Sequence, residues 1–289
     1  MNILILGGTG QVGFELQRSL APLGTIIAPS RSDLDLMSEQ AVSEYLQSHK
    51  PDLIANAAAW TAVDAAEKSQ EAAYRLNGGL PEQLARYAVE KGARLVHYSS
   101  DYVYSGAGNT PWTEDSPTGP LSVYGQSKLA GDEAIQKSGA DHLIFRTSWV
   151  YSARGHNFMK TMLRLAQEKE SLNIVADQIG APTPARLIAD VTALAVHKDL
   201  ESGLYHLTTT GQTSWHGFAL EIFKLARQMG QVLTLQAENV KAISTSDYPT
   251  PAQRPLNSRL SVTKVEHKLN VRLPNWQLQL ELTLAELLK

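Results

Sequence analysis

Short apolar runs alternate with longer amphipathic stretches through the first half of the chain. The first run, residues 2–6, is rich in β-forming residues and stops at a glycine, as a buried parallel strand does before a tight turn. Further strands are expected at 25–28, 52–55, 93–98 and 141–147, and helices after the first strand and near 38–48, 70–91 and 122–138. This alternation predicts an α/β fold, a doubly wound parallel sheet with crossover helices over residues 1–150.

The pattern loosens after residue 150. Proline-rich turns occur at 181–184 and 248–251, and helices are expected near 156–169, 186–198, 214–229 and 276–288. We expect a second, smaller α/β substrate lobe formed by residues 151–185 and 213–289, while residues 186–212 return to the first domain. No repeat or flexible linker separates the lobes, so we expect them to interleave.

A glycine-rich turn separates the first strand from the helix that follows it. Glycines at positions 7, 8, 10 and 13 fit both G-x-G-x-x-G and G-x-x-G-x-x-G. Without a Cβ they permit a tight turn, let the backbone approach a pyrophosphate and allow the helix to pack closely on the strand. The strand before and the helix after favour a dinucleotide turn over the alternative, a glycine-rich turn without a ligand. The residues expected to bind a dinucleotide here are Gly7, Gly10, Gln11, Val12 and Gly13.

The segment after the second strand should set the preference for the cofactor's ribose. No acidic residue ends that strand, and Arg31 follows Gly13 by 18 residues, where a guanidinium could hold a 2′-phosphate. This favours NADPH over NADH, with NADH still possible. The alternative is that Arg31 is a solvated surface charge. Asp35 and Leu36, in the same segment, are also expected to contact the cofactor.

A hydroxyl, a phenol and an ammonium follow the dinucleotide turn in the order needed for carbonyl reduction. Ser100 ends the fourth strand, at the carboxyl edge where ligands of open α/β sheets bind. Tyr124 and Lys128 lie one turn apart on the next helix and share one face. There the ammonium is expected to lower the pKa of the phenol, so that Tyr124 donates a proton as hydride arrives. The alternative is a chance Y-x-x-x-K on an amphipathic helix.

Composition excludes several other classes of function. The chain has 26 Lys and Arg against 29 Asp and Glu, without a dense basic run, so we expect no nucleic-acid or membrane partner. Cysteine is absent, and the eight histidines show no ligand spacing, so a protein-built metal site is not expected. No apolar stretch is long enough to span a bilayer, and the first strand begins at residue 2. We therefore expect a cytoplasmic protein.

These features resemble the extended short-chain dehydrogenase/reductase superfamily, which has a Rossmann-type sheet. Further matches are the small residues after the third strand and Asn77 in the long helix. A narrower resemblance, to the dTDP-4-dehydrorhamnose reductase family, covers nearly the full length of the chain. Its motifs are matched at 56–67, 100–104, 146–151, 177–183 and 254–260.

The narrower resemblance implies a reaction and a set of contacts. The reaction is reduction of the 4-keto group of dTDP-6-deoxy-L-lyxo-4-hexulose by NAD(P)H, which gives dTDP-L-rhamnose. Ser100, Tyr124 and Lys128 would be catalytic. The expected cofactor contacts include Ala57, Ala58, Ala59 and Thr61, and the expected substrate contacts are Asp101, Tyr102, Trp149, Arg254 and Asn257. The alternatives are that Trp149 and Trp215 are core aromatic residues and that Arg254 is a surface charge. A loop position favours a functional role for Arg254.

The same resemblance bears on assembly. Some members of the family are thought to dimerise through Mg²⁺ held by interface glutamates, one of them matched here by Glu15. Arg186 stands where a second carboxylate would fall, and its positive charge opposes Mg²⁺ binding. We therefore expect no metal, and a monomer or a metal-free homodimer that binds a small dTDP-sugar.

Three other functions fit parts of the pattern. A sugar-nucleotide 4,6-dehydratase would be expected to have Asp-Glu after the hydroxyl of the fourth strand, whereas this chain has Asp101-Tyr102. An epimerase would keep Tyr124 and Lys128 and retain NAD, which Arg31 disfavours. A non-catalytic subunit that binds NADPH for regulation would be expected to lose the tyrosine or the lysine, and this chain has both.

Overall fold

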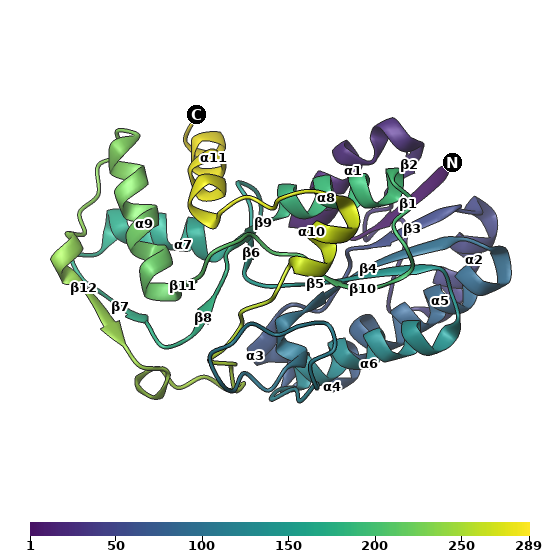
Figure 1. Ribbon diagram of the computed structural model, residues 1–289, viewed down its shortest axis with the longest axis horizontal. Helices are drawn as coiled ribbons and strands as arrows, with labels where there is room; N and C mark the ends of the chain where they lie inside the picture. Colours follow the sequence, from purple (N-terminus) through teal and green to yellow (C-terminus); the bar gives the residue numbers. More distant parts are fainter.

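The structure is a computed structural model that describes residues 1–289, and a six-stranded parallel sheet lies at its centre (Figure 1). The strand order is β10-β5-β4-β3-β1-β2, and each neighbouring pair is parallel, so the predicted doubly wound sheet is confirmed. The strands are β1 (Asn2–Leu6), β2 (Thr25–Ile27), β3 (Leu53–Asn56), β4 (Arg94–Ser100), β5 (His142–Thr147) and β10 (Gly203–His206).

Helices cover both faces of this sheet. One face packs against α1 (Gln11–Ser19), α8 (Ala185–His197) and α10 (Thr263–Leu269), and the other against α2 (Glu39–His49), α5 (Leu80–Lys91) and α6 (Val123–Ser138) (Figure 1). Successive β1 side chains serve opposite cores: Ile3 and Ile5 join the first core, and Leu4 and Leu6 join the second. Each such fully buried side chain stabilises the fold by about 1.5–3 kcal/mol. The apolar run predicted as the first strand is therefore buried on both faces.

The segment predicted as one helix over 70–91 is helical but interrupted. It comprises α4 (Gln70–Tyr74), a π-helical turn (Arg75–Gly79) and α5. Pro81 has no N–H to donate to the carbonyl of Asn77, four residues earlier, which accounts for the break in the α-helical pattern. Helix α6 approaches this turn so closely that a Cβ on Gly131 would lie 2.1 Å from the Asn77 carbonyl oxygen.

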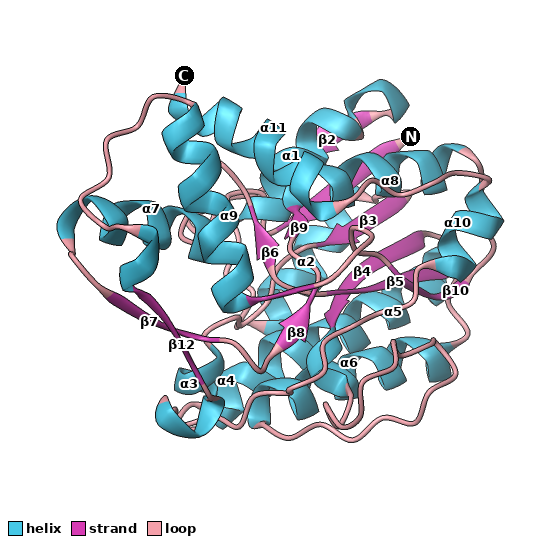
Figure 2. Ribbon diagram, turned by 60° about the vertical axis from the view of Figure 1, so that its left-hand side comes forward, coloured by secondary structure: helices cyan, strands magenta, loops and turns pink.

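A second core lies beyond the carboxyl ends of the sheet (left in Figure 1). Its helices are α7 (Phe158–Glu168), α9 (Trp215–Gln228) and α11 (Trp276–Leu288), which the sequence predicted within a few residues. Short strands pair around it, and β7 lies beside β12 away from the main sheet (Figure 2). The short elements are α3 (Val63–Ala66), β6 (Val150–Tyr151), β7 (Leu172–Val175), β8 (Ile179–Gly180), β9 (Thr183–Pro184), β11 (Thr213–Ser214) and β12 (Val240–Ile243).

The chain crosses between the two cores more often than a simple two-domain order requires. Strand β10 joins the central sheet beside β5, and α8 packs on α1. Helix α10, which the sequence did not predict, also belongs to the first core through Val265 and Leu269. The expectation that all of 213–289 lies in the second lobe is therefore wrong for α10. No helix has the length and apolar character needed to span a membrane.

Candidate active site

A cleft of about 810 Å³ runs along the carboxyl edge of the sheet. It is lined by the glycine-rich turn, by the segment after β2, by the small residues after β3, and by Tyr124 and Lys128 of α6. The predicted cofactor residues that line it are Gly7, Gly10, Gln11, Val12, Arg31, Asp35, Leu36, Ala57, Ala58, Ala59 and Thr61. The structure therefore brings these separate segments together around one cavity.

The glycine-rich turn owes its shape to close backbone contacts. Gly7 has φ +78°, and a Cβ there would lie 2.7 Å from the backbone nitrogen of Ala58. A Cβ on Gly13 would lie 2.1 Å from the Gly7 carbonyl oxygen, although Gly13 does not line the cleft. Gly7 thus provides the turn, and Gly13 lets α1 pack against it. No side chain caps the first turn of α1, so its backbone N–H groups remain available for an anion at the helix N-terminus.

Arg31 is exposed at one end of the cleft and forms no ion pair. The neighbouring acidic residues are engaged locally: Asp33 accepts hydrogen bonds from Ser30, and Asp35 accepts the backbone N–H of Met37 at 2.9 Å. An unpaired guanidinium at this position can bind a phosphate in a bidentate manner.

The end of β4 and the start of α6 place the three expected catalytic side chains. Ser100 ends β4 and its hydroxyl accepts the backbone N–H of Tyr102, whereas Ser122 caps α6 by accepting the N–H of Gly125 at 3.2 Å. Helix α6 begins close against the 101–103 turn, because a Cβ on Gly125 would lie 2.3 Å from the Tyr102 carbonyl oxygen. Tyr124 lies in the first turn of the helix, with its ring edge-on to Tyr102 at 5.3 Å.

Burial dominates the electrostatics of Tyr124 and Lys128. Burial raises the pKa of the Tyr124 phenol, and hydrogen bonding to Ser100 counteracts this. Burial lowers the pKa of Lys128 to about 8, and the negative charge of Asp132 opposes that shift. The net shift of the Tyr124 pKa is therefore upward and not downward as expected, because burial is its largest cause. The ammonium instead donates to the Tyr98 carbonyl oxygen at 2.6 Å, and the phenol stays protonated at neutral pH.

Asp101 lies behind Ser100 and is buried. Its Oδ1 accepts the Ser100 hydroxyl at 3.1 Å, and its Oδ2 has no hydrogen-bond partner. Burial raises its pKa to about 6, against hydrogen bonds from Ser258 and Ser100. A carboxyl group with one free oxygen beside the Ser100 hydroxyl can hold a polar group of a ligand.

Trp149 has an unusual backbone conformation, with φ +50°. Its indole stacks on Trp215 at 3.7 Å between ring centroids and lies against Gly180, where a Cβ would come within 2.9 Å. Both indoles are only half-buried, and Trp215 also packs against the second core beside Phe158 and Phe218. A non-glycine residue held in the left-handed region is a feature that clusters at functional sites.

Two residues of the 254–257 segment behave differently. Arg254 donates to the Tyr102 hydroxyl at 3.3 Å and pairs with Asp64 at 2.7 Å, so it faces the same region as Tyr102. The side chain of Asn257 is 1% exposed and bonds the Ala107 and Thr110 carbonyl oxygens and Arg259. The Asn257 amide is therefore occupied within the protein and holds the loop that begins after β4.

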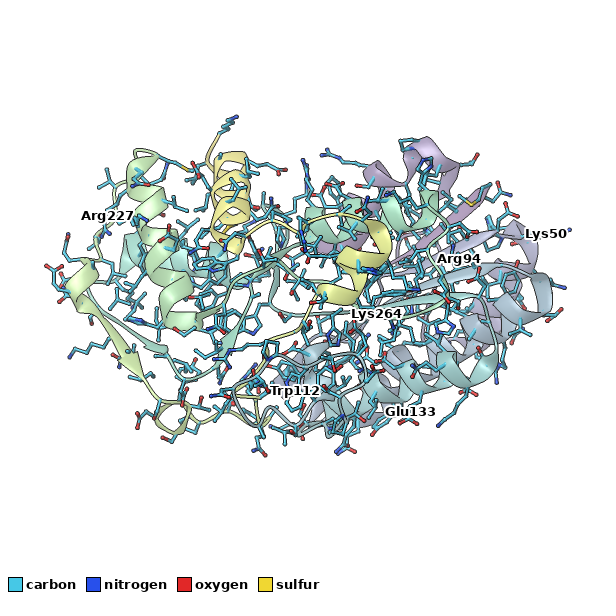
Figure 3. The ribbon with its side chains drawn as sticks, in the orientation of Figure 1. Lys50, Arg94, Trp112, Glu133, Arg227 and Lys264 are labelled. Atoms are coloured by element: carbon cyan, nitrogen blue, oxygen red, sulfur yellow. The ribbon has the colours of Figure 1, made fainter.

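Trp112, labelled in Figure 3, belongs to the same loop and fixes it further. Its ring stacks on Tyr104 at 5.0 Å, and its indole N–H donates to the Asn257 carbonyl oxygen at 3.0 Å. The loop after β4 and the segment 257–260 are thereby tied together beside the site.

Comparison with known proteins supplies the family. The model of the RmlD substrate binding domain matches residues 1–289. The dTDP-4-dehydrorhamnose reductase of Salmonella typhimurium is 49% identical, over 99% of this chain and 98% of that protein. The chain belongs to the dTDP-4-dehydrorhamnose reductase family.

Solved structures of family members have the same fold. The enzyme of Clostridium acetobutylicum superposes with a TM-score of 0.92 at 34% identity, over the whole of both chains. The enzyme of Bacillus anthracis, solved in complex with NADP, gives a TM-score of 0.91 at 34% identity over 99% of both chains.

In this member of the dTDP-4-dehydrorhamnose reductase family, Arg186 occupies the region expected to hold carboxylates. Its guanidinium lies 3.1 Å from Glu15 and 3.5 Å from Glu286. No group of three His, Cys, Asp or Glu residues is arranged to hold a metal ion. The two glutamates thus contact the same positive charge, which is the guanidinium of Arg186.

Several residues of the reductase site were not assigned by sequence reasoning. Asp64 pairs with Arg254, Asp132 lies one turn after Lys128, and Asn56 and His97 are cross-strand neighbours beneath the lysine. Asn77 donates to Ser127 of α6 and also bonds the backbone of Trp60 at the cleft wall. Polar residues inside otherwise apolar strand and helix patterns were the available signal for Asn56, His97 and Asn77.

Proposed function

We propose that this protein reduces the 4-keto group of dTDP-6-deoxy-L-lyxo-4-hexulose to give dTDP-L-rhamnose, with NADPH as the hydride donor. The observation that carries the proposal is the position of Tyr124 and Lys128 in the wall of the cleft that the glycine-rich turn also lines. Membership of the dTDP-4-dehydrorhamnose reductase family supports the choice of substrate. The Bacillus anthracis relative in complex with NADP supports the choice of cofactor.

The residues present fit a phosphorylated dinucleotide. The Gly7–Gly13 turn and the uncapped N-terminus of α1 would hold the pyrophosphate, and Arg31 would bind the 2′-phosphate. The small side chains of Ala57, Ala58 and Ala59 leave room along the cleft. When bound, NADPH supplies hydride to the carbonyl carbon and becomes NADP⁺.

The protein's own groups then manage the proton and the developing negative charge. The single O–H of Ser100 turns from Asp101 Oδ1 to donate to the substrate carbonyl oxygen, and Tyr124 transfers its phenolic proton to that oxygen as the carbon gains hydride. Because burial raises the pKa of Tyr124, the phenol carries its proton when the substrate arrives. Lys128 stabilises the resulting phenolate by its positive charge. The product is an alcohol, and Tyr124 recovers a proton from solvent.

The substrate contacts follow from the groups around Ser100. Asp101 and Tyr102 would bind the sugar, with Trp149 stacked against it, and Arg254 would bind the diphosphate. Asn257 would act indirectly, by holding the loop after β4. We further propose that residues 1–150 and 186–212 form the dinucleotide-binding part, and that the protein is a monomer or a metal-free homodimer.

The test follows NADPH absorbance with purified protein and the 4-keto sugar nucleotide, which the preceding enzymes generate in the same reaction, and identifies the product by chromatography and NMR. Oxidation of NADPH in step with dTDP-L-rhamnose formation supports the proposal. An epimerase would interconvert sugar nucleotides without net NADPH oxidation, and a dehydratase would release water from dTDP-glucose. NADPH binding without turnover of any sugar nucleotide would indicate a regulatory subunit.

The Tyr124→Phe variant serves as the matched control, because it removes one oxygen and keeps the ring. We expect turnover to fall at least about 100-fold, since general acid catalysis typically contributes 10²–10⁴-fold, while NADPH still binds. Full activity in this variant would refute Tyr124 as the proton donor.

A further inference from the structure

The Lys128 ammonium is buried and has fixed acceptors on the protein side. Its side chain is 2% exposed, and its Nζ donates to the Tyr98 carbonyl oxygen at 2.6 Å. A second neighbour, Nε2 of His97, lies 3.4 Å away. An ammonium has three N–H donors, so these two contacts leave one for the cleft that Lys128 lines.

The contact with His97 determines which nitrogen of the imidazole carries the proton. A lysine ammonium can only donate, so His97 Nε2 must accept with its lone pair, and the proton of the neutral ring must be on Nδ1. Burial and the charge of Lys128 lower the pKa of His97 well below its usual value, so the ring remains neutral.

Asn56 supplies the group that Nδ1–H requires. It pairs with His97 across the β3–β4 ladder, and its amide nitrogen Nδ2 lies 3.2 Å from Nδ1, while its Oδ1 is buried without a hydrogen-bond partner. Only the amide oxygen can accept from Nδ1–H, and a half-turn of the amide exchanges Oδ1 and Nδ2 without moving any other atom. We therefore assign the amide with Oδ1 toward the ring, where it accepts from Nδ1–H. The chain of donors therefore runs from Lys128 to His97 to Asn56.

We propose that His97 is a positioning residue for the reduction: with its tautomer fixed by Asn56, it holds the Lys128 ammonium so that one N–H faces the cofactor cleft. This inference rests on the proposed function of Lys128. The other groups that face Lys128 or its charge partner are Asp132 and Tyr124 on α6 and Arg146 on β5, which pairs with Asp132 at 2.9 Å. Asp132 favours the charged form of Lys128 through its negative charge, and His97 favours it by accepting a hydrogen bond.

Two substitutions of His97 distinguish the effect of its hydrogen-bond acceptor, Nε2, from the effect of the volume of its ring. In His97→Gln the amide reaches as far as Nε2, so an acceptor for Lys128 remains. In His97→Asn the amide reaches only as far as Nδ1, so the contact with Asn56 remains and Lys128 loses its acceptor. We expect kcat/KM to fall about 10- to 100-fold in His97→Asn and only a few-fold in His97→Gln, because hydrogen bonds to charged groups are the stronger ones.

The pH profile gives a readout that simple packing would not change. Loss of an acceptor destabilises the ammonium relative to the neutral amine, so the Lys128 pKa falls and the alkaline limb of kcat/KM moves to lower pH in His97→Asn. In His97→Gln the limb stays in place. A matched control is His206→Gln, which alters a buried histidine that bonds the Tyr104 hydroxyl instead, and it should leave the limb unmoved. Equal rates and equal pH profiles for His97→Asn and His97→Gln would overturn the proposal.

A direct measurement does not depend on turnover. NMR of the full-length protein labelled with ¹⁵N-histidine distinguishes a protonated from a bare ring nitrogen, and the His97→Gln spectrum assigns the signal. A protonated Nδ1 with a bare Nε2, unchanged across neutral pH, is the expected result. A protonated Nε2 would overturn the relay whether or not the protein reduces the proposed sugar.

Discussion

Gly13 gives a sharp test of how the cofactor turn is built. A Cβ at this position would lie 2.1 Å from the Gly7 carbonyl oxygen, 2.6 Å from its carbon and 2.9 Å from the Gly8 Cα. All three are backbone atoms, so no side chain can rotate away. Ordinary carbon contacts need about 3.5 Å, so Gly13→Ala forces α1 and the glycine turn apart by about 1 Å.

That separation disturbs the packing of the first core and lowers the stability of the protein. Leu16 on α1 and Leu20 directly after it are fully buried in that core, and overpacking of this kind typically costs about 1–3 kcal/mol. The gain in helix propensity from glycine to alanine returns at most about 1 kcal/mol. We therefore expect Gly13→Ala to lose about 1–2 kcal/mol of stability, which corresponds to a fall in Tm of roughly 2–8 °C for a protein of this size. Thermal unfolding without cofactor, followed by circular dichroism, measures this change.

Gly10→Ala is the matched variant in the same turn. Its Cβ would meet only the Gly7 carbonyl oxygen, at 3.2 Å, and its φ of −76° suits any residue. Gly10 lines the cleft, whereas Gly13 does not. Gly10→Ala should therefore change Tm little and weaken NADPH binding, measured by fluorescence titration. A Gly13→Ala protein that melts at or above the wild-type temperature would refute the packing argument.

The remaining predictions concern charge. Arg31→Ala should raise the KM for NADPH about 10- to 100-fold and leave that for NADH nearly unchanged, because it removes a charge-assisted bond to phosphate; equal effects on both cofactors would contradict the assignment. Since the Arg186 guanidinium contacts Glu15, chelation by EDTA should change neither turnover nor the sedimentation coefficient, and a metal-dependent change in either would count against this view. The pH profile of kcat/KM should fall below about 6, where Asp101 becomes protonated, and above about 8, where Lys128 loses its proton; a flat profile from pH 5 to 9 would disprove these roles.

Periodicity was enough to predict the sheet and most helices, because both depend on local apolar patterns. The helices α6, α8, α9 and α11 lie within a residue or two of their expected positions. Helix α10 was missed because it has seven residues and only Val265 and Leu269 are buried, which is too short a stretch for a periodic signal. The π-helical turn was missed because Pro81, which accounts for it, lies inside an otherwise helical pattern of residues.

The sequence predicted the site residues that lie on one helix, and it missed the pairs that join separate elements. Tyr124 and Lys128 share a helix, so their spacing alone places them together. The pair formed by Asn56 and His97 depends on strand register, and that formed by Asp64 and Arg254 joins α3 to a distant loop. The error in the pKa direction of Tyr124 arises from burial, which the sequence did not show.

Strand β4 departs from the apolar pattern of a buried strand because its polar side chains contact partners on the helices at both faces. Leu95, His97 and Ser99 face α6, where His97 lies beside Lys128 and the Ser99 hydroxyl donates to Asp132 at 2.9 Å. Tyr98 faces the opposite side and bonds Thr192 of α8 at 2.9 Å. Buried polar groups are costly unless they are bonded, and partnered ones fix a unique arrangement. His97 and Ser99 thus lie on the same face of β4 and contact two successive turns of α6. These contacts keep the phenol and the ammonium in position before any ligand binds.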